Sequence, residues 1–420
     1  MNKSGHRQFR RLLEVSALAA CTISFAGCGG QGSGSSGGGS FTTNLYTSIA
    51  LADFNSDGNL DIATCYTIVS NGSNGHKGTV QVFLQDAAHP GKFLAPANYS
   101  VGDDPFTIAV GDLNGDGKPD IVTANTSLST TNPNSVSVLL QNGNGQFLPA
   151  TNYSTGNVVN SVAIADVNGD GRADLLVADS SGISILLQNS ANPGTFTAAG
   201  SVSVTCCASS VAVRDVNGDG VPDLVAANGA NVFVFLGDAS APGTFLPAVP
   251  YSAGQQPLYV AVADLNGDGK PDIAVADLGS PSNGTTTGVH VLLQNPSAPG
   301  TFEAPADYTT GSGSTELAIA DLDGDGTPDI AAASGGNASV LFGSIASPGT
   351  FPTINNYPGN QVQTQFQTLP PMVLWVAIGD LNGDGKPDLV FADDTGVSIR
   401  FQDPANLGKF LSSVSVISSP

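Results

Sequence analysis

A nine-residue pattern, Asp-x-Asn/Asp-x-Asp-Gly-x-x-Asp, occurs seven times in this chain and constrains its fold more than any other feature. The first Asp residues of consecutive copies are 59, 54, 49, 49, 57 and 59 residues apart. A period of this length fits a repeating unit of four short strands joined by turns. The sequence therefore predicts seven structural repeats within one large β architecture.

The spacing within each copy is that of a calcium-binding loop. Oxygen-bearing side chains at positions 1, 3 and 5 converge when the chain curls tightly, and Ca²⁺ takes about 6–8 oxygen ligands. Gly at position 6 permits the positive φ of the curl, and the variable position 7 is expected to offer its backbone carbonyl. We therefore predict up to seven Ca²⁺ ions. The predicted ligand positions 1, 3, 5, 7 and 9 are Asp53, Asn55, Asp57, Asn59 and Asp61; Asp112, Asn114, Asp116, Lys118 and Asp120; Asp166, Asn168, Asp170, Arg172 and Asp174; Asp215, Asn217, Asp219, Val221 and Asp223; Asp264, Asn266, Asp268, Lys270 and Asp272; Asp321, Asp323, Asp325, Thr327 and Asp329; and Asp380, Asn382, Asp384, Lys386 and Asp388.

An EF-hand loop begins in the same way but requires a Glu at position 12 and a helix on each side. Short β-prone runs flank the loops instead, such as residues 108–110 before the second loop and 121–123 after it. Each loop is therefore expected to join two strands of a β-hairpin. The residues at position 12 are Thr64, Thr123, Val177, Ala226, Val275, Ala332 and Phe391.

A phenylalanine also recurs once per repeat, in most copies after Pro-Gly-x. The third repeat then divides into strands at 161–165, 175–178, 183–188 and 195–204. The predicted fold class is all-β: a seven-bladed β-propeller of four-stranded antiparallel blades, with a calcium loop in the first hairpin of each blade. The phenylalanines, which we expect to pack between neighbouring blades, are Phe93, Phe147, Phe196, Phe245, Phe302, Phe351 and Phe410.

These loops and their spacing resemble the FG-GAP/VCBS repeat family, whose best-known fold is the head of the integrin α-subunit. The resemblance covers residues 45–420 and implies a seven-bladed propeller with ions in the first hairpins. The Phe-Gly signature stands at Phe342-Gly343, whereas several copies carry Leu-Gln-Asn, as at 187–189. This departure points to a bacterial branch and counts against integrin-type ligand recognition.

The acidic residues are concentrated in the loops, which hold 22 of the 35 Asp and Glu residues. Seven divalent cations would reduce the formal net charge from −22 to −8. Without cations the clustered carboxylates repel one another, so the hairpins are expected to open. The negative charge excludes nucleic acid as a partner, because such binding requires clustered Lys and Arg. A hydrophobic content of 40% argues against disorder.

The N-terminus has the features of an export signal, with basic residues before an apolar stretch at 15–26 that is too short to span a bilayer. Cys21 and Cys28 each end an apolar run like a bacterial lipobox, in which the cysteine is acylated; an ordinary cleaved signal is the alternative. Cys21 fits the lipobox better, but a Gly/Ser-rich tether begins directly after Cys28, which we favour. The predicted organisation is a signal peptide at 1–28, a tether at 29–44 and a propeller at 45–420. The chain is then exported and lipid-anchored in the bacterial outer membrane or periplasm, touching the membrane only through its N-terminal lipid.

Three further cysteines form no disulfide framework. Cys65 is expected to be a small core residue. Cys206 and Cys207 either form a vicinal disulfide in an oxidising compartment or remain as two buried thiols.

Ring closure has two solutions, because the chain begins on the first strand of blade 1 and ends on the last strand of blade 7. The two blades either pack against each other with separate sheets, or residues 41–46 add a strand to blade 7.

The longest irregular segments, 66–78, 125–135, 277–288 and 358–373, are all expected on the face opposite the metal loops. Variable loops on a rigid scaffold are where binding residues concentrate. We therefore expect a binding patch over blades 1, 2 and 5 and the crossover between blades 6 and 7, with Trp375 and Tyr66 as candidate contacts. The alternatives are that these loops are merely solvated and that Trp375 belongs to the core.

Three classes of function compete for such a chain. We favour an adhesion or ligand-binding lipoprotein of the cell envelope, whose partner is a protein or a glycan. The others are a carbohydrate-active enzyme, either a polysaccharide lyase or a hydrolase, and a module of a larger envelope complex. An enzyme requires convergent acid and base groups, but His76, His89 and His290 belong to different blades and turn types. No catalytic residue is predicted.

Overall fold

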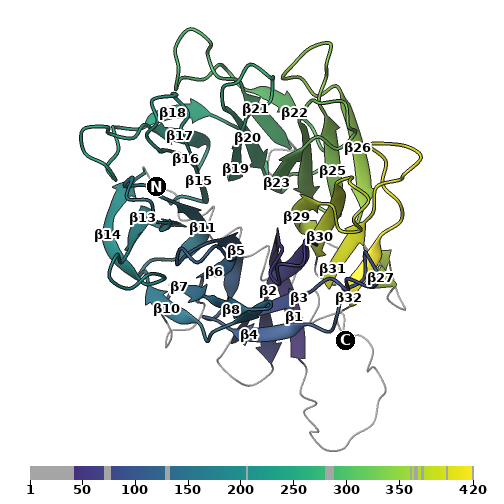
Figure 1. Ribbon diagram of the computed structural model, residues 1–420. Coiled ribbons are helices and arrows are strands. Elements are labelled where there is room, and N and C mark those ends of the chain that lie inside the picture. The colour runs from purple at the N-terminus through teal and green to yellow at the C-terminus, as the bar shows by residue number, and fades with distance from the viewer. Residues whose placement is uncertain are drawn as a thin grey trace, which may run out of the picture.

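The computed structural model describes residues 42–70, 77–127, 133–204, 207–279, 288–359, 362–363, 368–369, 373–393 and 396–418. Within these ranges every regular element is a strand, and no helix is long and apolar enough to cross a membrane. Seven four-stranded antiparallel sheets form a closed ring (Figure 1). The expected all-β, seven-bladed propeller is thereby confirmed.

Each blade is built outward from the axis from an inner, a second, a third and an outer strand. The inner strands are β1 (Thr42–Ala52), β5 (Pro105–Gly111), β11 (Val159–Ala165), β15 (Ser210–Arg214), β19 (Pro257–Ala263), β23 (Ser314–Ala320) and β29 (Val373–Gly379). The second strands are β2 (Asp61–Ser70), β6 (Asp120–Asn125), β12 (Asp174–Asp179), β16 (Asp223–Asn228), β20 (Asp272–Asp277), β24 (Asp329–Ser334) and β30 (Asp388–Asp393). The third strands are β3 (Lys77–Phe83), β7 (Ser135–Leu139), β13 (Gly182–Gln188), β17 (Asn231–Phe235), β21 (Val289–Leu292), β25 (Asn337–Phe342) and β31 (Gly396–Arg400). The outer strands are β4 (Ala97–Ser100), β10 (Thr151–Ser154), β14 (Phe196–Ser203), β18 (Val249–Ser252), β22 (Ala306–Tyr308), β26 (Thr353–Pro358) and β32 (Val414–Ser418).

Two short hairpins supplement the blades. One, in the turn between the third and outer strands of blade 2, pairs β8 (Gln141–Gly143) with β9 (Gln146–Phe147). The other pairs β27 (Val362–Gln363) with β28 (Thr368–Leu369), within the segment that connects blades 6 and 7.

The hydrophobic core lies between the blades rather than within them. Seven clusters of buried side chains occupy the seven blade interfaces among the described residues. Between blades 2 and 3, for example, Val122, Val136, Val162 and Val177 pack together with Phe196. A single twisted sheet has no interior of its own, so each blade gains its core only by packing on both neighbours. This explains why the second strands are short apolar runs, since both of their faces are covered.

Blades 1 and 7 close the ring by packing, with each blade keeping its own four strands. Tyr46 and Ile49 of β1 share a cluster with Val390 and Ile399 of blade 7, and Figure 1 shows the purple β1 near the yellow-green strands of blade 7. The alternative, in which residues 41–46 extend blade 7, is wrong because Thr42–Tyr46 pairs with β2. The last three residues of the segment that the sequence assigned to the tether, 42–44, also belong to β1.

Both aromatic residues predicted as surface contacts are buried instead. Tyr66 lies inside β2, which continues to Ser70, so this part of the predicted loop 66–78 is strand. Its ring packs on Tyr46, with 5.1 Å between the centroids. Trp375 packs edge-on against Phe106 at 5.4 Å. Each is only 6% exposed and belongs to the core cluster between blades 1 and 7. The prediction that they contact a ligand is therefore wrong, and the alternative that Trp375 belongs to the core is confirmed.

The cysteine predictions are tested in part. Cys65 is fully buried within β2, as expected of a core residue, and burial raises the pKa of its thiol to about 12. Its sulfur lies 3.3 Å from the hydroxyl oxygen of Thr47. Cys206 lies outside the described residues, as do Cys21 and Cys28, so the predictions for these three residues stay open.

Candidate metal centres

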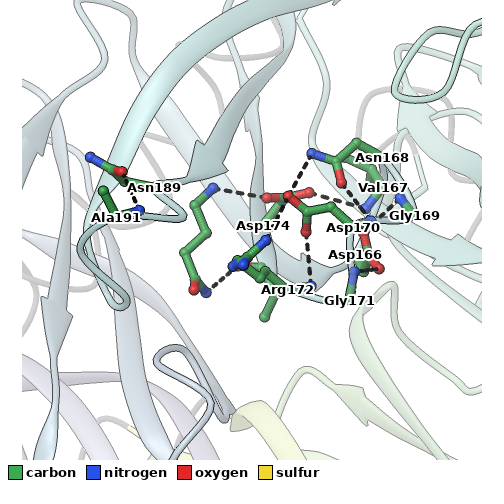
Figure 2. Close-up of polar contacts among 12 residues, drawn as sticks. Asp166, Val167, Asn168, Gly169, Asp170, Gly171, Arg172, Asp174, Asn189 and Ala191 are labelled. Carbon is green, nitrogen blue, oxygen red and sulfur yellow. Dashed lines mark hydrogen bonds and ion pairs between the residues drawn. The ribbon is translucent and has the colours of Figure 1, made fainter.

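Each predicted metal loop joins the inner and second strands of its blade and is held by its own backbone. In the third loop, the two carboxylate oxygens of Asp166 accept the amides of Asp170 at 3.1 Å and of Gly171 at 2.7 Å (Figure 2). The Asn168 side-chain oxygen accepts the amide of Asp170, and the Asp170 carboxylate accepts the amide of Arg172, both at 2.9 Å. These bonds gather the side chains of positions 1, 3 and 5 around the curl, as the ligand prediction requires.

Three of these four bonds recur in all seven loops. Position 1 accepts the position 6 amide, position 3 the position 5 amide, and position 5 the position 7 amide. The position 6 glycines have φ between 80° and 88°, a region that residues with a side chain rarely adopt. The loop geometry is therefore one shape repeated seven times.

The sixth loop gives the sharpest test of whether these residues fit a cation. Oxygens of Asp321, Asp323 and Asp325 all lie within 4.8 Å of one another. Burial and the charges of the two neighbouring carboxylates raise the pKa of Asp323. Three hard oxygens at this separation suit Ca²⁺ and repel one another without a cation. The residues therefore fit the predicted ion.

Position 9 has a second role that the sequence did not reveal. Asp272, for example, is fully buried, and its two oxygens accept the amides of Leu265 at 2.9 Å and Gln294 at 2.7 Å. The first amide belongs to position 2 of the same loop and the second follows the third strand. The corresponding pair of bonds occurs in every blade. The position 9 carboxylate thus braces three strands, while its remaining lone pairs can still face an ion.

Burial raises the pKa of these position 9 carboxyls. It reaches about 6 in Asp61, Asp120, Asp272 and Asp388 and about 7 in Asp329. The charges of other Asp residues in the same loop raise it further, from positions 1 and 5 in most loops and from positions 1 and 3 in the sixth, whereas the two backbone hydrogen bonds lower it. A cation in the loop would favour the ionised form of the whole cluster.

The position 7 side chains serve the loops in two ways. Lys118 and Arg172 form ion pairs with the position 5 carboxylate of their own loop, at 3.2 and 3.4 Å. Lys270 and Lys386 instead donate to a backbone carbonyl in the turn between the third and outer strands of their own blade. Whether position 7 carbonyls bind an ion stays a prediction.

The recurring phenylalanines pack between blades, as expected, but their partners were missed. The Phe196 ring meets the Tyr153 ring of the preceding blade edge-on, with 5.8 Å between centroids, and the Tyr153 hydroxyl oxygen accepts the Phe196 amide at 3.3 Å. Five such ring pairs occur among the described residues; the others are Tyr99–Phe147, Tyr251–Phe302, Tyr308–Phe351 and Tyr357–Phe410.

A sequence signal for these tyrosines does exist. In five repeats a Tyr stands six residues after the Phe, and in the other two, after Phe196 and Phe410, the position holds Val202 and Val416. The phenylalanines that pack near these valines are Phe245 and Phe93. These two are only half-buried, whereas the five that face a tyrosine are buried.

The face opposite the metal loops carries the long connections between second and third strands, whose centres at 71–76, 128–132 and 280–287 lie outside the described residues, as does His76. At the base of the third of these, His290 is 2% exposed and its ring nitrogens contact Asp307 at 2.6 Å and Asp277 at 3.3 Å. Burial lowers the pKa of His290, but the two carboxylates outweigh it and the net shift is upward. His89, by contrast, is exposed in a turn on the metal-loop face beside Asp86. The described histidines therefore lie apart, as the sequence indicated.

The fold and its loops define a β-propeller built from repeats that each carry one Asp-rich loop. The chain belongs to the FG-GAP-like repeat family, whose model matches residues 67–123, 127–177, 166–226, 215–275 and 276–332. A search of the curated proteins finds no match to the sequence.

Solved structures with a similar fold have diverse functions. A lectin from Agrocybe aegerita, which recognises non-reducing terminal N-acetylglucosamine, is 22% identical; the match covers 77% of this chain and 82% of the lectin, with a TM-score of 0.51. BBS1N, solved in complex with ARL6DN, is 13% identical over 87% of this chain and 97% of its own, with a TM-score of 0.52. The rhamnogalacturonan lyase YesW is 14% identical over 87% and 73%, with a TM-score of 0.48. At such identities the likeness concerns the fold alone.

Proposed function

We propose that this protein is a calcium-stabilised scaffold of the bacterial cell envelope that binds a protein or glycan ligand on the face opposite its metal loops. The observation that carries the calcium part is the sevenfold recurrence of one loop geometry, with oxygen ligands gathered by the same backbone bonds in each blade. This arrangement brings the negative charges of 22 loop aspartates close together within their loops, which is unfavourable because they repel one another. A divalent cation in each loop offsets that repulsion.

Within each loop the side chains of positions 1, 3, 5 and 9 would hold the ion together with the position 7 carbonyl. The ion supplies positive charge and a rigid junction between the inner and second strands; it has no part in a reaction. The chain's own residues complete the junction, because the position 9 carboxylate fixes the third strand to the same loop.

The ligand-binding part follows from the opposite face, where blades 1, 2 and 5 have long connections. In blades 3, 4 and 6 the same connections are two-residue turns, such as the one between Asp179 and Gly182. Long loops on a rigid scaffold are suited to recognition. The uneven loop lengths around an otherwise regular ring support a binding patch there.

The test combines a glycan array with a pull-down from envelope extracts, both with the calcium-loaded protein. Replacing the blade 5 loop by the two-residue turn of blade 3 should abolish binding, whereas rebuilding the blade 3 turn with alanines should leave it intact. Binding that survives shortening of each of the three long loops contradicts the proposal. Cleavage of a polysaccharide in a parallel screen would favour a carbohydrate-active enzyme instead.

The envelope location rests on lipidation of Cys28 or Cys21. Labelling of the expressed full-length chain with an alkynyl fatty acid should be lost on Cys28→Ala and kept on Cys21→Ala. The reverse pattern would place the lipid on Cys21. Retention of label in both single variants and in the double variant would refute lipid anchoring at either cysteine.

A further inference from the structure

The turn between the third and outer strands of each blade, here named the cover turn, lies against the metal loop of the preceding blade. In blade 3, a Cβ atom on Gly194 would lie 3.2 Å from the Cβ of Asn114, position 3 of the second metal loop. Gly194 has φ of 80° and allows this close approach. The corresponding contacts are Gly91 on Asn382, Gly243 on Asn168, Gly300 on Asn217, Gly349 on Asn266 and Gly408 on Asp323, all between 2.9 and 3.6 Å.

The first metal loop is the exception. Blade 2 covers it with the β8–β9 hairpin, which lacks the Pro-Gly turn, and the nearest atoms to a Cβ on Gly145 all belong to Leu84. Six of the seven loops are thus covered in the same way: the cover turn of the next blade packs on position 3, a predicted calcium ligand.

A glutamine side chain adds a polar link in three of these junctions. The Gln188 amide group donates to the carbonyl of Leu113, position 2 of the second metal loop, at 2.8 Å. The backbone amide of the same residue donates to Asp174, position 9 of the third loop, at 2.9 Å. One residue therefore connects two consecutive metal loops. Gln294 and Gln402 form the same link to Val216 and Leu322.

The seventh loop joins the two ends of the chain. Its position 3 residue, Asn382, is covered by the blade 1 turn at Gly91, whose Cβ would also lie 2.9 Å from the Phe401 ring of blade 7. No strand is shared between blades 1 and 7 within the described residues. The junction under Gly91 is therefore a contact that can hold the ring closed on the metal-loop face.

We infer that calcium in a metal loop fastens its blade to the following blade, and that the ion of the seventh loop closes the ring by holding the blade 1 cover turn in place. The inference rests on the proposed calcium binding. An ion fixes the side chain of position 3, and the cover turn of the next blade packs on this side chain. When the ion leaves, the carboxylates separate, and the cover turn loses the fixed side chain on which it packs. The effect of each ion then reaches a segment far away in the sequence.

Hydrogen–deuterium exchange on the full chain in calcium tests this directly. Asp384→Asn removes a charged ligand from the seventh loop but retains an acceptor for the Lys386 amide. Exchange in the blade 1 cover turn, residues 86–94, should accelerate about fivefold or more, the lower range of coupling between sites. The blade 7 cover turn, residues 403–409, packs on the sixth loop and is linked to the seventh through the Lys386 side chain, so its exchange should accelerate less than that of residues 86–94. Asp116→Asn in the second loop is the matched control and should accelerate residues 189–195 instead.

The reciprocal experiment alters the cover. Because coupling acts equally in both directions, Gly91→Ala should raise about fivefold the calcium concentration that protects the amides of Gly383 and Gly385. Gly156→Ala is the control, since Gly156 also has positive φ but has open space around its Cβ position. If Gly91→Ala does not fold, the Asp384→Asn comparison decides alone.

Two results would overturn the inference, and they are distinguishable. If calcium protects the amides of the seventh loop but Asp384→Asn accelerates exchange only within residues 373–391, each ion serves its own hairpin and the fastening role is wrong. If calcium does not protect the seventh-loop amides of the unaltered protein at all, both the proposed calcium binding and the fastening role fail.

Discussion

The buried position 9 carboxylates should stabilise the propeller even without calcium, and Asp120 is the clearest case. Its two oxygens accept the amides of Leu113 at 2.9 Å and Gln141 at 2.7 Å, and it is fully buried. Asp120→Ala leaves both amides without a partner, and an unsatisfied buried group costs about 1–3 kcal/mol. The free energy of unfolding in EDTA should therefore fall by roughly 2–6 kcal/mol.

Asp116 of the same loop is the matched control. It is exposed, and in EDTA Asp116→Ala should change the free energy of unfolding by no more than about 1 kcal/mol. In calcium both variants should be destabilised, because both lose a proposed ligand. Asp120→Asn, which retains one acceptor oxygen, should fall between the alanine variant and the parent.

Denaturant unfolding can be followed through Trp375, the single tryptophan of the chain, which is buried between the inner strands. Coincidence with the far-UV circular dichroism transition would show that one cooperative transition is measured. If Asp120→Ala and Asp116→Ala lose the same free energy in EDTA, the bracing role of position 9 is refuted and these residues act as metal ligands alone.

Two further predictions concern contacts outside the metal loops. Tyr308→Phe keeps the edge-on packing on Phe351 but removes a hydrogen bond to its amide, so thermal unfolding should show a loss of about 0.5–1.5 kcal/mol; an unchanged stability would mean that the hydroxyl contributes nothing. His290 has a raised pKa beside Asp277 and Asp307, so its stabilisation is fully present below its unfolded pKa of about 6.5 and is lost as pH rises through the higher folded value. The difference in unfolding free energy between the parent and His290→Ser should therefore shrink as pH rises above about 6.5, and a difference that is constant with pH contradicts this account.

The sequence was sufficient for the features that depend on neighbouring residues. Each metal loop is closed by bonds among nine consecutive residues, so its pattern could be recognised directly and counted, and the strands of the third repeat were placed within two residues of β11, β12 and β13. The blade count followed from the same repetition.

The features that the sequence left unclear depend on which blade faces which. Gln188 donates to Leu113, 75 residues away, and nothing local distinguishes it from a solvated glutamine. Tyr66 was predicted at the surface because the loop was expected to begin at residue 66, whereas Trp375 was predicted either as a ligand contact or as a core residue of an inner strand. Tyr66 is buried against Tyr46 of β1 and Trp375 against Phe106 of β5, and these rings belong to one cluster together with residues of blade 7. The Tyr partners could have been found from the sequence, because in five repeats a Tyr stands six residues after the Phe of the same repeat. The spacing does not show that each Tyr packs on the Phe of the next blade.

The central claim, that calcium holds this propeller together, is tested most directly by thermal melting of the mature chain in excess calcium and in EDTA. One site at a hundredfold excess over its dissociation constant contributes about 2.7 kcal/mol, and up to seven sites act together. We predict a higher melting temperature in calcium, which falls in EDTA and returns when calcium is restored but not when magnesium is added. An identical melting temperature in calcium and in EDTA would contradict the account.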